Sequence, residues 1–221
     1  MLLFKQNCIH IFDCDGVLLD SNHAKVEILA TAFKKIYSPS SFIKWAQEEF
    51  RANFGRTRSV HFDLFQEYIG ADGYRLNNVD RKKAYKVYED GVKKLYDHCD
   101  LIKETKDYID SLEVGNHYVV SASDQTELQK SLPKIYTSLS VNNIFGGPAS
   151  KIENINKVIS ENPKASQFVL YGDSVADAKA TIATKIDFIG LTRFSADPKG
   201  LSLFCMNNNL DLKETCSELA L

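Results

Sequence analysis

A short apolar run that ends in two closely spaced aspartates constrains this chain more than any other feature. Residues 9–12 are mostly apolar and partly β-branched, and the run is too short for a helix, so it predicts a buried strand. Asp13 and Asp15 follow it at once, and Gly16 comes next. Because side chains two residues apart on a strand share a face, the two carboxylates can be directed at one point. Ligands of open α/β sheets bind beyond the carboxyl ends of the strands, so we expect a working acidic pair here.

The two aspartates create an electrostatic problem that a ligand would solve. Two carboxylates about 4 Å apart repel each other by about 4 kcal/mol at an effective dielectric constant of about 20. A divalent cation, a shared proton or a cationic neighbour would relieve this repulsion. An Asp-x-Asp on its own is more often a pair of turn-forming or helix-capping residues, but the strand before it favours the functional interpretation. We expect Cys14, between the two, to be a small buried residue and not a nucleophile, because carboxylates raise the pKa of a thiol.

Composition limits the class of protein and its partners. The 221 residues fit one large domain or a core with a smaller insert, and the net charge of −2 offers no basic field for nucleic acid. No apolar run approaches the ~20 residues of a membrane span, and the first residues lack the pattern of a secretory signal. The five cysteines form no C-x-x-C and no zinc-ligand spacing, which suits a reducing compartment. We therefore expect a cytoplasmic protein with neither a nucleic-acid nor a membrane partner.

Two patterns of secondary structure divide the chain. Residues 23–36 have apolar positions at a helical period, and no strand is predicted over residues 41–97, which contain further helical segments. From residue 101 onward, helices alternate with short β-branched strands. The helices are expected at 42–53, 60–69, 80–96, 103–112, 124–132 and 151–159, with another ending at 184; the strands are expected at 117–121, 144–145, 168–171 and 187–191.

This order predicts an α/β protein with a doubly wound parallel sheet and an inserted α-helical cap. Residues 1–20 and 98–221 are expected to form the core, and residues 21–97 the cap, placed at the strand ends beside Asp13. Such a cap can exclude water and select the substrate. After residue 200 the pattern is ambiguous: residues 201–206 are interpreted as an edge strand and residues 212–219 as a short helix.

Further polar residues follow the later strands. Ser121 ends the second predicted strand, Asp173 ends the fourth, and Asp177 lies four residues later on a helix. Lys151 opens another helix, where a cation opposes the helix dipole. Each residue alone has an ordinary explanation as a strand-end hydroxyl, a cap or a solvated lysine. Several carboxylates with a hydroxyl and an ammonium at one sheet edge instead describe a Mg²⁺-dependent phosphoryl-transfer site.

Four segments resemble, in order, the motifs of the haloacid dehalogenase-like hydrolase superfamily, in the capped subgroup that includes phosphoglycolate phosphatases and beta-phosphoglucomutases. The resemblance extends over residues 9–195 and implies a Rossmann-like core of that superfamily. The four segments are Phe12-Asp13-Cys14-Asp15-Gly16-Val17, Val119-Val120-Ser121-Ala122-Ser123, Gly146-Gly147-Pro148-Ala149-Ser150-Lys151 and Gly172-Asp173-Ser174-Val175-Ala176-Asp177.

The resemblance implies a chemical role for each carboxylate. Asp13 would attack phosphorus and form an aspartyl-phosphate. Asp15 would protonate the leaving oxygen and later deprotonate water. Asp13, Asp173 and the backbone carbonyl of Asp15 would hold Mg²⁺. Dehalogenating relatives generally lack an acid at the Asp15 position, so this residue favours phosphate chemistry.

The other motif residues would bind or support these groups. Ser121, Ala122 and Lys151 would bind the phosphoryl oxygens, and Asp177 and Ser174 would support the metal site and the lysine from behind.

The predicted cap offers two arginines to the substrate. Arg56 and Arg58 lie in a helix break at residues 53–58, where they are expected to bind a second anionic or hydroxylated part of the substrate. A solvated pair of loop arginines is an equal alternative. Residues 21–23 follow the nucleophile loop and are candidates to contact the leaving group, although His23 is favoured as a surface residue.

The function predicted first is a Mg²⁺-dependent phosphatase of a small phosphorylated metabolite, a sugar or sugar-acid phosphate, acting as a monomer or homodimer. A phosphosugar mutase of the same superfamily is the main alternative. A phospho-accepting signalling module is disfavoured, because a receiver carries its phosphorylated aspartate after the third strand and has no helical insert after the first. A silent binding protein is disfavoured by the complete motif set, and a dinucleotide oxidoreductase by the lack of G-x-G-x-x-G.

Overall fold

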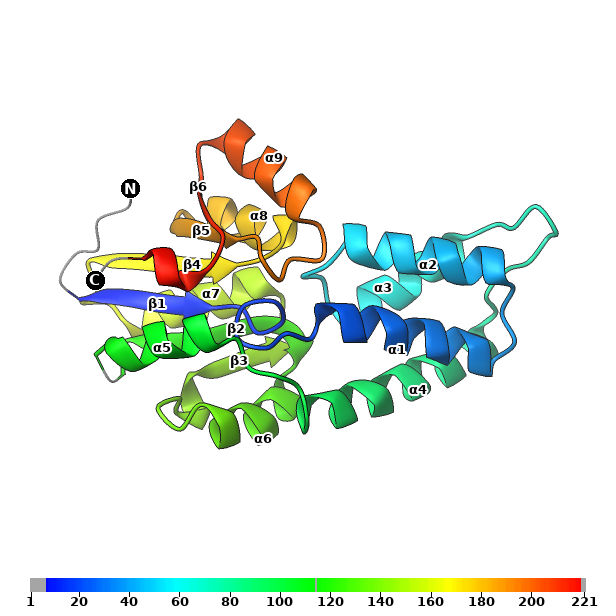
Figure 1. Cartoon of the computed structure of the whole chain (residues 1–221), viewed down its shortest axis with the longest axis horizontal. Coiled ribbons are helices and arrows are strands. Elements are labelled where there is room, and N and C mark those ends of the chain that lie inside the picture. The colour runs from blue at the N-terminus through cyan, green and yellow to red at the C-terminus, as the bar shows by residue number, and fades with distance from the viewer. Residues whose placement is uncertain (1–6, 114, 220–221) are drawn as a thin grey trace.

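A parallel β-sheet forms the centre of the protein. The structure is a computed structural model, and it describes residues 7–113 and 115–219. Within these residues the strand order is β3-β2-β1-β4-β5-β6, and every pairing is parallel (Figure 1). The strands are β1 (Cys8–Phe12), β2 (His117–Asp124), β3 (Ile144–Gly147), β4 (Gln167–Gly172), β5 (Asp187–Leu191) and β6 (Asp211–Lys213).

The position of β1 in the sheet decides where the motifs meet. All five residues of β1 are buried, as expected for a central parallel strand whose two faces are both covered. β1 pairs with β2 on one side and with β4 on the other. The carboxyl ends of these three strands are therefore neighbours, and so are the residues that follow them.

Helices cover both faces of the sheet. Phe12 of β1 packs in one core with α5 (Lys103–Ser111) and α6 (Gln125–Ile135). Ile9 and Ile11 point to the opposite face and pack with the other helices of the core. Those helices are α7 (Lys151–Glu161), α8 (Val175–Thr184) and α9 (Pro198–Asn208). The predicted doubly wound sheet is confirmed.

Between β1 and α5 the described chain forms helices and no strand. The helices are α1 (Asn22–Lys35), α2 (Ser40–Ala52), α3 (Arg58–Leu64), a 3₁₀ turn (Phe65–Glu67) and α4 (Asn78–Tyr96). They lie together beyond one end of the sheet, as Figure 1 shows. Packed aromatic rings hold them to one another, with ring centroids 4.8 Å apart for Phe33 and Phe42 and 5.5 Å apart for Phe62 and Phe65. We call residues 21–97 the cap; its boundaries stay a prediction.

The predicted C-terminal elements were wrong. Residues 201–206 lie inside α9 and do not form an edge strand. Asp197 caps this helix by accepting a hydrogen bond from the backbone N–H of Gly200 at 3.0 Å, and Pro198 occupies the first turn. The edge strand is β6, and residues 212–219 contain a 3₁₀ turn (Cys216–Glu218) in place of the predicted helix. Within the described chain, none of the helices has the length and apolar character needed to span a bilayer.

Candidate active site

The loop after β1 is fixed by backbone hydrogen bonds. The Asp13 N–H donates to the carbonyl of Tyr171 in β4 at 2.9 Å, which ties the aspartate to the neighbouring strand. The Gly16 N–H donates to the carbonyl of Leu19 at 2.8 Å and closes the loop. Both Asp13 and Asp15 are buried, and Cys14 between them is completely buried, as predicted. Burial and the adjacent carboxylates raise the pKa of the Cys14 thiol well above its ordinary value, so it is no nucleophile here.

Lys151 lies between two of the carboxylates. Its ammonium is 2.9 Å from Asp13 Oδ1 and also pairs with Asp177. Ser150 caps α7 by accepting a hydrogen bond from the Glu153 N–H, and this start of the helix places Lys151 at the sheet edge. Burial lowers the pKa of the Lys151 ammonium, but the charges of Asp13 and Asp177 outweigh it, and the net pKa is raised. Lys151 is therefore a permanent cation beside Asp13.

Asp13, Asp173 and Asp177 form a buried acidic cluster. One oxygen from each lies within 4.8 Å of the others, a spacing at which they could hold a metal ion. Burial raises the pKa of Asp13 to about 6, and burial with the charges of Asp177 and Asp13 raises that of Asp173 well above its usual value. The carboxylate charge here exceeds the charge that Lys151 supplies. Carboxylate oxygens with uncompensated charge fit Mg²⁺, a hard cation that prefers oxygen ligands.

The cluster is held from behind by side chains and by a helix cap. Asn22 Nδ2 donates to Asp173 Oδ2 at 2.7 Å and to the carbonyl of Phe194 at 2.8 Å. Ser174 caps α8, donating through Oγ to Asp177 Oδ2 at 2.8 Å and accepting from the Asp177 N–H at 3.2 Å. Asn22 thus orients one carboxylate and Ser174 orients the other, and the supporting roles of Ser174 and Asp177 stay a prediction.

We expect Gly16→Ala to damage this cluster. Gly16 has a φ of +77°, and a Cβ there would lie 2.4 Å from both Asp173 Oδ2 and Asn22 Nδ2. The added methyl group would strain the backbone and displace Asp173, and we expect the free energy of unfolding to fall by about 2–4 kcal/mol. The thermal stabilisation that Mg²⁺ gives should fall with it. Gly73→Ala is a matched control, because Gly73 has a φ of +78° but nothing within 4 Å of the added Cβ. Equal losses in urea unfolding for the two variants would contradict the prediction.

Asp15 faces the cap. Its carboxylate accepts hydrogen bonds from Ser21 Oγ at 2.5 Å, Ser123 Oγ at 2.9 Å and the Tyr96 hydroxyl at 3.0 Å, and Lys25 Nζ lies 2.5 Å from it. Burial raises the pKa of Asp15, but Lys25 and the hydrogen bonds from Ser21 and Ser123 outweigh burial, so the net pKa is below its usual value. Asp15 is therefore an ionised carboxylate in this arrangement.

Sequence reasoning missed Lys25 and Tyr96. Lys25 is buried on the same face of α1 as Leu29 and Ala32, four and seven residues later. A lysine in the apolar stripe of an amphipathic helix was the available signal. Tyr96 gave no such signal, because a buried tyrosine at the end of a helix is ordinary.

Ser121 and Ala122, the predicted phosphate-binding residues, lie in the last half of β2, which continues to Asp124 and does not end at Ser121 as predicted. The register between β2 and β3 shifts between Val120 and Asp124, so this part of β2 leaves the regular ladder of backbone hydrogen bonds. Ser121 is buried, and its Oγ accepts a hydrogen bond from the Ser123 N–H at 3.2 Å. Both Ser121 and Ala122 line the same cavity as Asp13.

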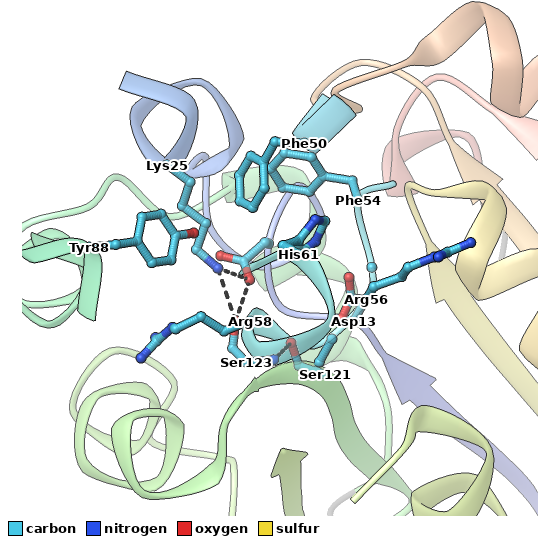
Figure 2. A pocket seen from close by; sticks show the side chains of 13 residues that line it. Asp13, Lys25, Phe50, Phe54, Arg56, Arg58, His61, Tyr88, Ser121 and Ser123 are labelled. Carbon is cyan, nitrogen blue, oxygen red and sulfur yellow. Dashed lines mark hydrogen bonds and ion pairs between the residues drawn. The ribbon is translucent and has the colours of Figure 1, made fainter. Parts of the chain in front are cut away.

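That cavity lies between the sheet edge and the cap and has a volume of about 40 Å³ (Figure 2). Its core side carries the carboxylates and the strand-end residues, and its cap side carries both aromatic rings and cationic side chains. The cap residues that line it are Lys25, Phe50, Phe54, Gly55, Arg56, Arg58, His61 and Tyr88. A cavity that combines polar, charged and aromatic side chains suits a phosphoryl group attached to a small organic group.

The two predicted cap arginines have different surroundings. Arg58 pairs with Glu127 of α6 at 2.8 Å and with Glu89 at 3.8 Å, and it lies over the Tyr88 ring. Burial lowers the pKa of Arg58, but Glu127 outweighs it and the net pKa is raised. Arg56 is exposed, and its guanidinium points away from Asp13 in Figure 2. His23 is exposed, in line with the surface position that the sequence favoured.

The fold and the site define an α/β enzyme that works at the carboxyl ends of its strands. The family model for haloacid dehalogenase-like hydrolases matches residues 10–191, and the chain belongs to this family of hydrolases. None of the curated proteins matches the chain in sequence.

Solved structures share this fold at low sequence identity. A predicted phosphatase from Clostridium acetobutylicum superposes with a TM-score of 0.73 and 15% identity over 97% of this chain and 96% of that chain. A predicted phosphoglycolate phosphatase from Haemophilus somnus has a TM-score of 0.67 and 18% identity over 83% of this chain and 84% of that chain. A protein assigned as a beta-phosphoglucomutase from Bacteroides vulgatus has a TM-score of 0.70 and 16% identity over 97% of this chain and 87% of that chain. At these identities the likeness is one of fold.

Proposed function

We propose that this protein is a Mg²⁺-dependent phosphatase that hydrolyses a small phosphorylated metabolite, a sugar or sugar-acid phosphate, through an aspartyl-phosphate. One observation carries the proposal: Asp13 lines a cavity together with Ser121, beside Lys151 and an acidic cluster with excess negative charge. Nucleophile, phosphate-binding groups and candidate metal ligands thus meet at one point. Phosphoryl transfer depends mainly on such positioning and charge neutralisation.

The chain's own residues supply the nucleophile and the anion contacts. Asp13 forms a bond to phosphorus as the bond from phosphorus to the leaving oxygen breaks. Lys151 and Ser121 bind the phosphoryl oxygens, and Asp13, Asp173 and the Asp15 carbonyl would hold Mg²⁺. The bound ion neutralises charge on the phosphoryl group. Water then attacks phosphorus and releases Asp13.

Asp15 acts as the general acid in the first step of this reaction, the attack by Asp13, and as the general base in the second step, the attack by water. It gives a proton to the leaving oxygen first and takes one from water afterwards. The ionised Asp15 seen beside Lys25 corresponds to the second half, in which a base is needed. For the first half, we expect the substrate to weaken the Lys25 contact, because an acid that is fully paired with an ammonium holds no proton to give.

The mutase alternative has less support from the surroundings of the cavity. A mutase must retain a bisphosphate while it turns over, which requires anchoring of a second phosphate by the cap. The guanidinium of Arg58 is already paired with Glu127 and Glu89, and Arg56 is exposed.

Removal of the metal tests the proposal. We expect phosphate release from one or more members of a panel of sugar phosphates, sugar-acid phosphates and phosphoglycolate when Mg²⁺ is present. A chelator should lower the rate at least about 10²-fold, because the phosphoryl charge then loses its main counter-charge. Excess Mg²⁺ should restore the rate, which controls for chelator-induced denaturation. Release that is indifferent to chelator would refute the metal dependence. No release from any substrate, with conversion of a sugar 1-phosphate to its 6-phosphate, would favour the mutase.

A further inference from the structure

A histidine in the cap wall has an unusual environment. His61 lies on α3, is only 3% exposed and lines the cavity that contains Asp13 and Asp15. Its Nδ1 atom is buried without a hydrogen-bond partner. Figure 2 shows the ring in the cavity wall, next to Phe50 and Phe54. A buried polar atom without a partner is unfavourable, so an apolar ring would be more favourable for stability alone.

The His61 ring is neutral. Burial, together with the charges of Arg56 and Lys25, lowers its pKa to about 3. The Arg56 backbone acts in the opposite direction and raises this pKa by a smaller amount. The Phe50 ring lies 4.4 Å away between centroids, which leaves the imidazole in apolar surroundings. A neutral imidazole offers one donor nitrogen and one acceptor nitrogen, and a hydroxyl group can partner either of them.

We propose that His61 is a specificity-determining residue that hydrogen-bonds a hydroxyl group on the leaving group of the substrate. The substrate class is then the phosphate monoesters of small, neutral, hydroxylated molecules. The proposal rests on the phosphatase function and narrows it. An anionic leaving group is less suited to this wall, because its cationic side chains are paired or directed outward. Arg58 is paired with Glu127 and Glu89, and Lys25 is paired with Asp15. Arg56 is exposed, and its guanidinium points away from Asp13 (Figure 2).

Binding of two matched ligands tests this contact without turnover. Glycerol 3-phosphate and n-propyl phosphate share a three-carbon chain and differ in their hydroxyl groups. In an Asp13→Asn background with Mg²⁺, calorimetry should show glycerol 3-phosphate binding about 10-fold to 10²-fold more tightly. Adding His61→Phe should bring the ratio of the two dissociation constants close to 1, with n-propyl phosphate little changed. His61→Asn, which keeps a polar amide, should retain part of the preference.

Two further measurements separate a contact from a structural effect. Phe62→Leu is a control on the same helix, because Phe62 is fully buried in the cap and is not among the cavity-lining residues; it should leave the ratio unchanged. In the chain with native His61, the ¹⁵N shifts of its ring should respond to glycerol 3-phosphate and not to n-propyl phosphate. This second readout does not depend on whether a His61 variant folds.

The outcomes distinguish this proposal from the proposed function. Three outcomes would overturn the role of His61. The ratio of the two dissociation constants could stay unchanged in His61→Phe, it could lie near 1 with native His61, or neither ligand could bind. If glycerol 3-phosphate binds with the expected preference and the chain with native Asp13 releases no phosphate from it or from the wider panel, the phosphatase function fails and the hydroxyl contact stands.

Discussion

Asp13→Asn is expected to lower phosphatase activity by about 10⁴-fold or more, because an amide cannot form the aspartyl-phosphate. The two side chains have nearly the same shape, so the packing of the loop should persist. Burial raises the pKa of Asp13 to about 6, so an ionised Asp13 is costly at pH 7, and its removal offsets the loss of the ion pair with Lys151. We therefore expect a melting temperature within a few degrees of that of the unchanged protein.

The measurement is steady-state phosphate release, together with acid-quenched trapping of radiolabelled phosphoenzyme. Asp20→Asn is the matched control: it makes the same chemical change on an exposed residue of the same loop and should leave the rate unchanged. Retention of more than about 1% of the rate, or a trapped phosphoenzyme in the Asp13 variant, would assign the nucleophile to another residue.

Lys151→Met is expected to give the largest loss of stability among these variants. Lys151 is 7% exposed and pairs with Asp13 and with the fully buried Asp177. Removal of one partner from a buried ionic group costs about 3–5 kcal/mol, because the remaining charge has no compensation. Activity should fall by about 10²-fold to 10³-fold as well, since one contact to the phosphoryl oxygens disappears.

Urea unfolding checks this prediction and offers two internal tests. The stability deficit should shrink when Mg²⁺ is added, because the ion supplies the missing positive charge. It should also shrink as the pH is lowered towards about 6. Without Lys151 the pKa of Asp13 lies above its value of about 6 in the unchanged chain, so the variant's Asp13 takes up a proton first and then needs no counter-charge.

Lys157→Met is the matched control on the same helix. Lys157 is largely exposed, with a 4.0 Å ion pair to Glu161 and a contact to the Phe145 ring, and its loss should cost no more than about 1 kcal/mol. Equal losses for the two lysine variants would contradict the buried-charge argument.

The ion pairs of Arg58 give this residue a structural role between the cap and the core. The sequence suggests a substrate-binding arginine, whereas the structure joins Arg58 of the cap to Glu127 of the core helix α6. A guanidinium engaged in this way links the two parts of the chain and has less capacity for an additional anion. The neutral His61 then becomes the cap residue with unused hydrogen-bonding capacity inside the cavity.

The core and its motifs could be predicted because their signals are local. A buried strand followed by acidic residues is visible in a few consecutive positions, and alternation of strands and helices determines that the strands are parallel. Carboxyl ends of neighbouring parallel strands share an edge of the sheet. The sequence alone therefore predicts that four residues lie close together: Asp13, Ser121, Lys151 and Asp173. The tail was predicted wrongly for a related reason: the apolar run at residues 201–206 is too short for its period to distinguish strand from helix. Asp197 and Pro198, a cap and a first-turn proline, were the better signal.

By itself, the sequence determined the class of fold, the family and the acidic and basic groups at the sheet edge. The tertiary structure alone decided the partners of those groups across the cap. Lys25 and Tyr96 reach Asp15 from different cap helices, and Arg58 reaches Glu127 across 69 positions of the chain. Such contacts depend on how helices pack against the core, and packing depends on the shape of many side chains at once. The same packing buries the Nδ1 atom of His61 without a hydrogen-bond partner, a state that no spacing in the sequence encodes.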